Sequence, residues 1–278
     1  RQDGVLVATY TYDAKGNRLS GPGGATGVYD AQDPLTRYDN ATYTYNTAGD
    51  LTARSQAGET TTYRYDELSN LVAVGLPDGR AIGYVIDGNN RRIGKTVDGV
   101  LRQGFLYQDQ LRIVAELDGS NHLVSHFVYA DNSTTPAYMT RNGVIYRLVS
   151  DHLGSVRLVV NVTTGEIAQR LDYDAFGVVL ADTNPGFQPF GFAGGLYDPD
   201  TGLVRFGKRD YDAQSGRWTT KDPLGMAGGD TNLYLYVGGD PVNLTDEGGD
   251  FFFLIGVLAA ILLLSVMALP LAMKILKK

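Results

Sequence analysis

The chain has 278 residues, with 35 glycines, 18 tyrosines and no cysteine, and its formal charge at pH 7 is −7. The lack of cysteine excludes a disulfide framework, and the abundance of tyrosine and glycine favours strands joined by tight turns over long helices. Because the last cations are Lys274, Lys277 and Lys278, residues 1–250 are more acidic still, which argues against a nucleic-acid partner that would need clustered cations.

From the N-terminus onward, the chain shows a repeat with a period of about 21 residues. Two aromatic or apolar residues are separated by one residue and followed by Asp or Asn, with glycine or asparagine three or four positions later. The four clearest copies are Tyr10–Gly16, Tyr43–Gly49, Tyr63–Asn70 and Leu171–Gly177. Weaker copies keep the phase near Asp87, Asp109, Asp131 and Asp151. The glycine-rich stretch Gly21–Gly27 lies in the one long gap, and we interpret it as an inserted loop.

The physical chemistry of this repeat predicts a β-hairpin. Because side chains alternate along a strand, the two aromatic side chains of Tyr-x-Tyr lie on the same face. The Asp or Asn that follows can bind nearby backbone N–H groups and begin a tight turn, which glycine completes. One hairpin cannot bury its apolar face alone, so the hairpins must stack side by side. The sequence therefore predicts an all-β fold in which stacked hairpins form one long sheet.

The repeat resembles the YD repeat of bacterial RHS proteins and teneurins, and the second half of the chain is similar to the RHS repeat-associated core domain. The matching segments of that half are Asp151–Arg157, Tyr173–Gly177, Phe190–Asp198, Arg209–Asp212, Gly216–Trp218, Asp222–Gly225, Asn232–Val237 and Asp240–Asn243. The resemblance implies YD repeats in residues 1–145 and a core domain in residues 146–249. It also implies a spiralling sheet that forms a hollow shell, which the core domain plugs. We expect so short a chain to form a partial shell, either an arc or a short plugged barrel, whose edges need further sequence or a partner.

The resemblance implies one chemical site. In many RHS proteins the core domain is an aspartyl autoprotease, in which two Asp residues, each in a DPxG-like motif, cut the chain just after the second motif. Asp222–Gly225 matches the first motif, and Asp246–Gly249 keeps the Asp and the final glycine of the second. Asp222 and Asp246 are therefore the candidate catalytic pair, since two close carboxyl groups can divide the roles of acid and base.

The second motif departs from the family pattern at two positions. Glu247 stands where the family has proline, and Asp250 stands where it has leucine at the cleavage point. A further carboxylate there would disturb the ionisation of the pair and obstruct an apolar cleavage pocket. We therefore predict at most a degraded autoprotease. The alternative is that both motifs are turns without catalysis, because Asp-Pro-x-Gly is good turn chemistry.

No cofactor or metal site is predicted. His122 and His126 have a spacing that could chelate a metal on a helix, but the residues around them alternate as in a strand, where they would lie about 13 Å apart. The lone Trp218 is expected in the core. Gly191–Gly195 is not a phosphate loop, because no helix pattern follows it, and no serine or cysteine nucleophile motif is present.

The C-terminal residues 250–278 predict a membrane anchor. Phe251–Met273 contains 23 uncharged residues, which as a helix would reach about 35 Å and cross a hydrocarbon core of about 30 Å. The positive-inside rule then places Lys274–Lys278 in the cytoplasm and the β domain in the periplasm or outside the cell. A sorting signal removed on export and a short membrane-active toxic payload are the alternatives.

These patterns favour a non-enzymatic scaffold. We expect a membrane-anchored β domain that binds a protein partner or covers a membrane assembly, with lipid contact through residues 251–273. The alternative is a polymorphic toxin or toxin shell, in which autoproteolysis releases a membrane-active C-terminal peptide. Recognition of cell-surface carbohydrate is a third possibility, because aromatic-rich β surfaces can stack on sugars. Since residue 1 is Arg and no signal-peptide pattern follows it, we expect a mature product or part of a longer chain.

Overall fold

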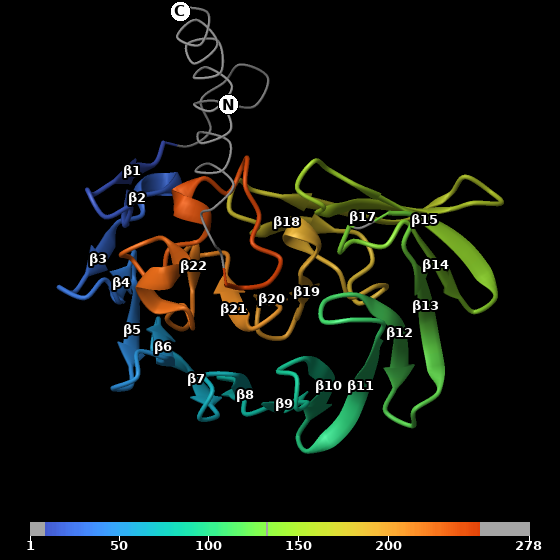
Figure 1. Ribbon diagram of the computed structural model, residues 1–278, viewed down its shortest axis with the longest axis horizontal. Helices are drawn as coiled ribbons and strands as arrows, with labels where there is room; N and C mark the ends of the chain where they lie inside the picture. Colours follow the sequence, from blue (N-terminus) through green and yellow to red (C-terminus); the bar gives the residue numbers. More distant parts are fainter. Residues whose placement is uncertain (1–8, 132, 251–278) are drawn as a thin grey trace, which may run out of the picture.

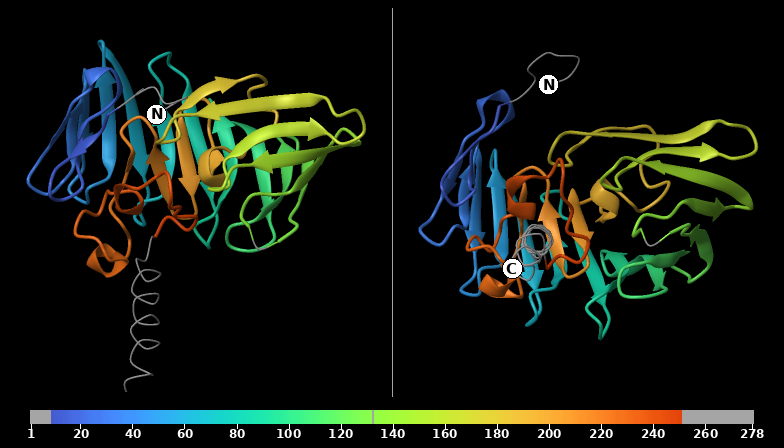
Figure 2. Two further views of the ribbon diagram at one scale, coloured as in Figure 1. Left: turned by 90° about the horizontal axis from the view of Figure 1, so that it is seen from above. Right: turned by 45° about the horizontal axis from the view of Figure 1, so that its top comes forward.

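The fold is a curved antiparallel β wall with a smaller sheet inside the curve. A computed structural model describes residues 9–131 and 133–250, and the regular structure of these residues is almost entirely β-strand (Figure 1). One sheet contains sixteen strands in simple chain order, each paired with its neighbour in sequence. A four-stranded sheet lies within its curve, as Figure 1 and the right-hand view of Figure 2 show. The predicted all-β fold with long antiparallel pairing is confirmed.

The first hairpin consists of β1 (Thr11–Tyr12) and β2 (Arg18–Ser20). The first half of the large sheet consists of β3 (Gly27–Tyr29), β4 (Leu35–Tyr38), β5 (Ala41–Tyr45), β6 (Leu51–Gln56), β7 (Glu59–Tyr65), β8 (Leu71–Gly75), β9 (Ala81–Ile86) and β10 (Arg92–Val97). The second half consists of β11 (Val100–Tyr107), β12 (Ile113–Asp118), β13 (Leu123–Val128), β14 (Tyr138–Arg141), β15 (Val144–Ser150), β16 (Val156–Asn161), β17 (Ile167–Tyr173) and β18 (Val179–Asp182). The inner sheet consists of β19 (Leu196–Tyr197), β20 (Leu203–Phe206), β21 (Arg209–Asp212) and β22 (Arg217–Trp218). Four short 3-10 turns are η1 (Pro22–Gly24), η2 (Phe192–Gly194), η3 (Gly225–Gly228) and η4 (Val237–Gly239).

The Asp of each repeat organises the hairpin turn. Oδ1 of Asp13 accepts hydrogen bonds from the backbone N–H groups of Lys15 (2.8 Å) and Asn17 (2.9 Å), two and four residues later. The same two bonds recur at Asp66, Asp87, Asp118, Asp151 and Asp174. The residue three positions after each Asp has a positive φ, which explains why glycine or asparagine is favoured there.

Two details of the repeat differ from the sequence interpretation. In the third clear copy, the residue with positive φ is Ser69 (φ 60°), and Asn70 is the buried residue that follows the turn. In the long gap, the predicted loop ends at Thr26, and a further hairpin, β3–β4, follows it. That hairpin is another copy of the repeat, because Asp30 accepts from the N–H of Gln32 and Asp33 takes the positive-φ position.

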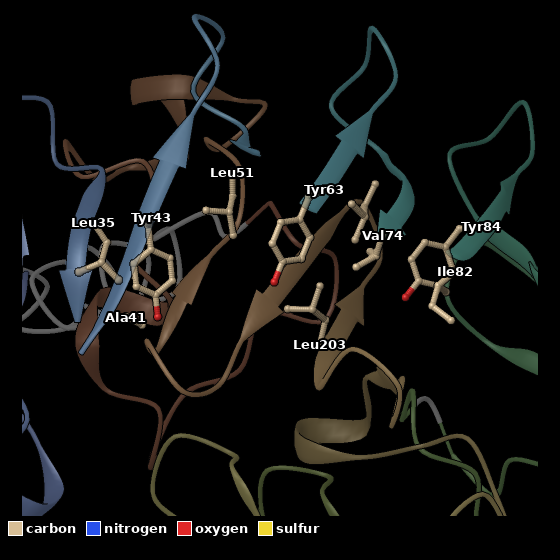
Figure 3. Packing of buried hydrophobic residues seen from close by; sticks show 10 residues of the cluster. Leu35, Ala41, Tyr43, Leu51, Tyr63, Val74, Ile82, Tyr84 and Leu203 are labelled. Atoms are coloured by element: carbon tan, nitrogen blue, oxygen red, sulfur yellow. The ribbon is translucent and has the colours of Figure 1, made fainter. Parts of the chain in front are cut away.

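The inner face of the wall carries the apolar core. Figure 3 shows buried side chains from β4 to β9 in a row along this face, with Leu203 of β20 opposite them. Tyr43, Tyr63 and Tyr84 are all buried in this cluster, as expected for aromatics that share one face of successive hairpins. Because each hairpin contributes only a few of these side chains, the core is continuous only when the hairpins are stacked.

Residues 190–250, called the plug here, have a core of their own. Phe206, Tyr211, Trp218 and Tyr236 lie in one cluster of aromatic rings, and each is at most 2% exposed. Centroid distances from Tyr211 to Tyr236 (4.4 Å) and from Trp218 to Tyr236 (5.4 Å) are in the range of favourable ring contacts. The expectation that Trp218 is a core residue is therefore confirmed.

Buried polar contacts join the plug to the turns of the wall. Arg217 of β22 donates to Oδ1 of Asn17 (2.8 Å) and to the carbonyl oxygen of Asp33 (2.7 Å). Asn17 in turn donates to Oδ1 of Asp33 (3.0 Å), so that one plug arginine contacts two successive turns. All three residues are buried.

An equivalent contact lies farther along the wall. Arg205 of β20 donates to Oδ1 of Asn70 (2.8 Å) and to the carbonyl oxygen of Asn90 (3.2 Å), while Asn70 donates to Oδ1 of Asn90 (3.1 Å). Asp210 pairs with Arg205 (3.0 Å) and with Arg92 of the wall (2.8 Å). The plug is thus held by charge-assisted hydrogen bonds as well as by apolar packing.

The first and last repeats of the described chain meet at one rim. The rings of Tyr10 and Phe176 are 5.0 Å apart at their centroids. The guanidinium of Arg18 lies 4.3 Å from the Phe176 ring and 4.7 Å from the Tyr38 ring, and it donates to the carbonyl oxygen of Gln214 (2.5 Å). These contacts connect the two ends of the wall through side chains, in agreement with a short plugged shell.

The wall continues beyond residue 145, where the resemblance places the start of the core domain. Strands β15 to β18 pair in register with the preceding strands, and the inner sheet begins only at β19. Within residues 9–131 and 133–250, no helix has the length and apolar character needed to cross a membrane. The predicted transmembrane segment 251–273 and the lysine tail lie outside the described residues.

Candidate functional site

The fold brings Asp222 and Asp246 to one guanidinium group. Nη2 of Arg209 lies 2.7 Å from Oδ2 of Asp222 and 3.3 Å from Oδ2 of Asp246. The side chains are 3%, 10% and 4% exposed for Arg209, Asp222 and Asp246 respectively, so the group is almost completely removed from water. The structure therefore places together the two carboxylates that the resemblance paired.

Local turn chemistry fixes Asp222. Its Oδ1 accepts from the N–H of Leu224 (2.8 Å), and its carbonyl oxygen accepts from the N–H of Gly225 (2.9 Å). The other carboxylate oxygen is thereby directed to Arg209. A pocket of about 400 Å³, lined by Asp222 and by the loop residues Gly225, Gly228 and Asn232, lies beside this carboxylate. The Asp-Pro-x-Gly motif thus forms a turn and also presents a carboxylate to the buried site.

Arg209 is the residue of this site that was not singled out from the sequence. Besides the two carboxylates, it donates from Nε to the carbonyl oxygen of Gly249 (2.5 Å). Its guanidinium lies 4.1 Å from the centre of the Trp218 ring. Burial lowers the pKa of Arg209, and the nearby carboxylates oppose that shift. The Arg-Asp dipeptide was part of the family resemblance, but nothing in its local pattern identifies the arginine as the link between two distant motifs.

One peptide bond is held at both ends within this site. The carbonyl oxygen of Gly249 accepts from Arg209, and the N–H of Asp250 donates to Oδ1 of Asp246 (3.2 Å). The two groups belong to the same peptide unit, Gly249–Asp250. The arrangement can polarise a carbonyl with a cation and places a carboxyl group beside the nitrogen, which are two of the contacts that peptide hydrolysis uses.

Glycines allow the end of the plug to approach the β20–β21 turn. A Cβ atom on Gly207 would lie 2.2 Å from the carbonyl oxygen of Gly248, and one on Gly249 would lie 2.3 Å from the carbonyl oxygen of Phe206. Both glycines also have positive φ, at +44° and +66°. The N–H of Lys208 donates to Gly248 (3.0 Å), so residues 248–250 lie against this turn by backbone contacts.

The predicted absence of a metal site remains a prediction. His122 lies in the turn before β13, where its Nδ1 is 3.4 Å from the carboxylate of Asp118, and His126 lies in β13. In the described ranges, no three His, Cys, Asp or Glu side chains are grouped in a way that could hold a metal ion.

An antiparallel wall of YD hairpins wrapped around its own C-terminal plug defines an RHS-type YD-repeat shell. The chain belongs to the teneurin YD-shell family, whose profile matches residues 2–242. It is 31% identical to Teneurin-3 of Danio rerio over 257 residues, which cover 87% of this chain and 9% of that protein. It is 28% identical to the tRNA3(Ser)-specific nuclease WapA of Bacillus spizizenii over 269 residues, 91% of this chain and 11% of that protein. The chain therefore spans about a tenth of these relatives.

A solved structure shares the fold. The crystal structure of TcdB2-TccC3-TEV matches with a TM-score of 0.51 and 18% identity, over 87% of this chain and 17% of that chain. At this level of identity the likeness concerns the fold alone.

Proposed function

We propose that this chain is a non-enzymatic β scaffold, anchored in a membrane through residues 251–273, that binds a protein partner or covers a membrane assembly. The observation that carries this proposal is a curved wall with its own plug, whose final residues 248–250 are fixed to the β20–β21 turn. An apolar segment follows directly in the sequence, so the shell would be held close to the lipid. We further propose that the shell is periplasmic or extracellular and the lysine tail cytoplasmic.

The edge of the sheet supports a partner-binding role. Strand β18 is an outer strand of the sixteen-stranded sheet, and Leu180 within it is 66% exposed. An outer strand offers unpaired backbone groups to an extended segment of another protein, and exposed apolar side chains beside it add contact area.

Deletion of residues 251–278 tests the anchor. The truncated protein should leave the membrane fraction and appear in the soluble extracytoplasmic fraction, because the acidic shell has no attraction to anionic lipid. In the full chain, protease added to cells stripped of their outer layers should digest the shell and leave the lysine tail protected. The reverse protection pattern would contradict the proposed topology. Retention of the truncated protein on membranes would instead reveal a protein partner bound to the shell.

A second candidate function is the toxin-shell role with autoproteolysis, and the contacts of the Gly249–Asp250 peptide unit favour it. In that reaction Asp222 would accept a proton from water, whose oxygen attacks the carbonyl carbon of Gly249. Arg209 would stabilise the negative charge on the carbonyl oxygen, and protonated Asp246 would give its proton to the nitrogen of Asp250 as the C–N bond breaks.

Intact mass and N-terminal sequencing distinguish the two functions. A scaffold keeps the tail joined to the shell, whereas autoproteolysis yields a fragment that begins at Asp250. Asp222→Asn and Asp246→Asn should each abolish that fragment. If the fragment forms equally in both variants, then a separate protease makes it and the pair is structural.

A further inference from the structure

Residue 250 has a charged neighbour. Nζ of Lys208 lies 2.5 Å from Oδ2 of Asp250, and the two side chains are 40% and 28% exposed. The lysine follows Gly207 in the β20–β21 turn, the same turn that binds residues 248–250 through its backbone. The carboxylate of Asp250, which was expected to obstruct an apolar cleavage pocket, is therefore compensated by the ammonium group of Lys208 beside it.

The backbone contacts fix how Lys208 meets Asp250. The N–H of Lys208 donates to the carbonyl oxygen of Gly248, and Nε of Arg209 donates to that of Gly249. Two successive residues at the junction of the β20–β21 turn and β21 therefore bind two successive residues near the end of the plug. This register brings the side chain of Lys208 to the side chain of residue 250. An apolar residue at position 250 would leave the ammonium group without its partner, and a cation would face it directly.

We propose that Lys208 is a specificity-determining residue of the site formed by Arg209, Asp222 and Asp246. It selects an acidic side chain at position 250 and so places the Gly249–Asp250 peptide unit on Arg209 and Asp246. The proposal rests on the second candidate function for its effect on cleavage. The placement of the peptide unit, however, is a property of the folded chain and can be measured whether or not the bond is cut.

The experiment measures hydrogen–deuterium exchange of the full chain in detergent, in peptides that cover residues 246–250. Lys208→Met and Asp250→Asn should each raise exchange at the Asp250 amide by up to about five-fold, the effect expected of an exposed ion pair worth up to about 1 kcal/mol. The exchanged pair Lys208→Asp with Asp250→Lys should restore protection. Arg170→Met, which removes an exposed cation of β17 from the carboxylate of Asp172 (3.0 Å), is the control and should leave this exchange unchanged.

The outcomes separate the two proposals. Unchanged exchange in both single variants, or failure of the exchanged pair to restore protection, would overturn the role of Lys208. If the wild-type chain is cut, the variants with less protected Asp250 amides should form the fragment more slowly. Asp250→Leu should be cut more slowly than wild type, and the exchanged pair should recover the wild-type rate of fragment formation. Faster cutting of Asp250→Leu would also overturn the acid-selecting role. An uncut wild-type chain whose exchange follows the predicted order would reject autoproteolysis and support the selection of residue 250 by Lys208.

Discussion

Replacing Asp210 by asparagine should destabilise the protein strongly, because this buried carboxylate is bound to two buried arginines. Its oxygens lie 2.8 Å from Arg92 and 3.0 Å from Arg205, and the three side chains are at most 3% exposed. Asn keeps the size of the side chain and removes the negative charge, leaving two guanidinium groups without that counter-charge. Removing one partner from a buried ionic contact costs about 3–5 kcal/mol, so we expect the free energy of unfolding to fall by that amount.

Urea denaturation of the full chain in mild detergent measures this effect with two probes. The single tryptophan, Trp218, is 1% exposed in the plug, so its fluorescence reports release of the plug, whereas far-UV circular dichroism reports the β wall. If Asp210 holds the plug to the wall, the fluorescence transition of Asp210→Asn should move to lower urea at least as far as the dichroism transition.

Asp172 supplies a matched control for burial. It also pairs with two arginines, Arg157 (2.7 Å) and Arg170 (3.0 Å), but its side chain is 31% exposed. Asp172→Asn should therefore cost less than about 1 kcal/mol. If Asp210→Asn costs no more than Asp172→Asn, the reasoning from burial is refuted.

Three further changes test other parts of the fold. Ser69→Gly should raise the free energy of unfolding by about 0.5–1 kcal/mol in urea denaturation, because Ser69 has a positive φ that glycine adopts without strain; a loss of stability would contradict this. Gly207→Ala should cost about 1–3 kcal/mol more than Gly58→Ala, since both have positive φ but only Gly207 lies against another backbone segment; equal costs would refute the close approach. Burial raises the pKa of Glu116, so the folded state holds that proton more tightly than the unfolded chain, and stability falls as pH rises from about 4.3 through the raised folded pKa. Across that window the unfolding free energy of wild type should decline relative to Glu116→Gln, and a pH-independent difference would exclude this role of Glu116.

The turns of the wall could be predicted from sequence because their chemistry is local. Asp13 binds backbone groups only two and four residues away. The Tyr-Asp dipeptide and the glycine that follows it are therefore sufficient to predict the turn. Where the signal is altered, prediction failed: Asp33 replaces glycine in the missed hairpin, and Ser69 takes the positive-φ position that was assigned to Asn70. The position of a YD turn is therefore predicted better by the position of its Asp than by the type of residue at the positive-φ position.

The site could be predicted only in part, because its contacts are long-range. Asp222 and Asp246 were paired through the family resemblance, and no spacing rule would have joined them. Arg209, which contacts both, reaches Gly249 across 40 positions of sequence. The contact between Arg217 and Asn17 spans 200 positions, and no local pattern in either segment indicates it. Such contacts depend on how far the wall curves before the plug enters it, which the repeat alone does not specify.

The two arginine contacts of the plug explain how the wall and the plug keep one register. Arg217 and Arg205 each contact two successive YD turns. Each arginine binds the side chain of the residue that follows the first turn, and it also binds the carbonyl oxygen of the positive-φ residue in the second turn. Because repeats are alike, apolar packing alone would tolerate a plug displaced by one hairpin. A plug displaced by one repeat would meet Pro34 in place of Asn17 and Arg91 in place of Asn70 at the equivalent turn positions. Pro34 offers no side-chain acceptor to an arginine, and a buried arginine facing Arg91 would be strongly unfavourable. The variation among the repeats at this position therefore supplies specificity that their common turn chemistry cannot, and it fixes where along the wall residues 248–250 are bound.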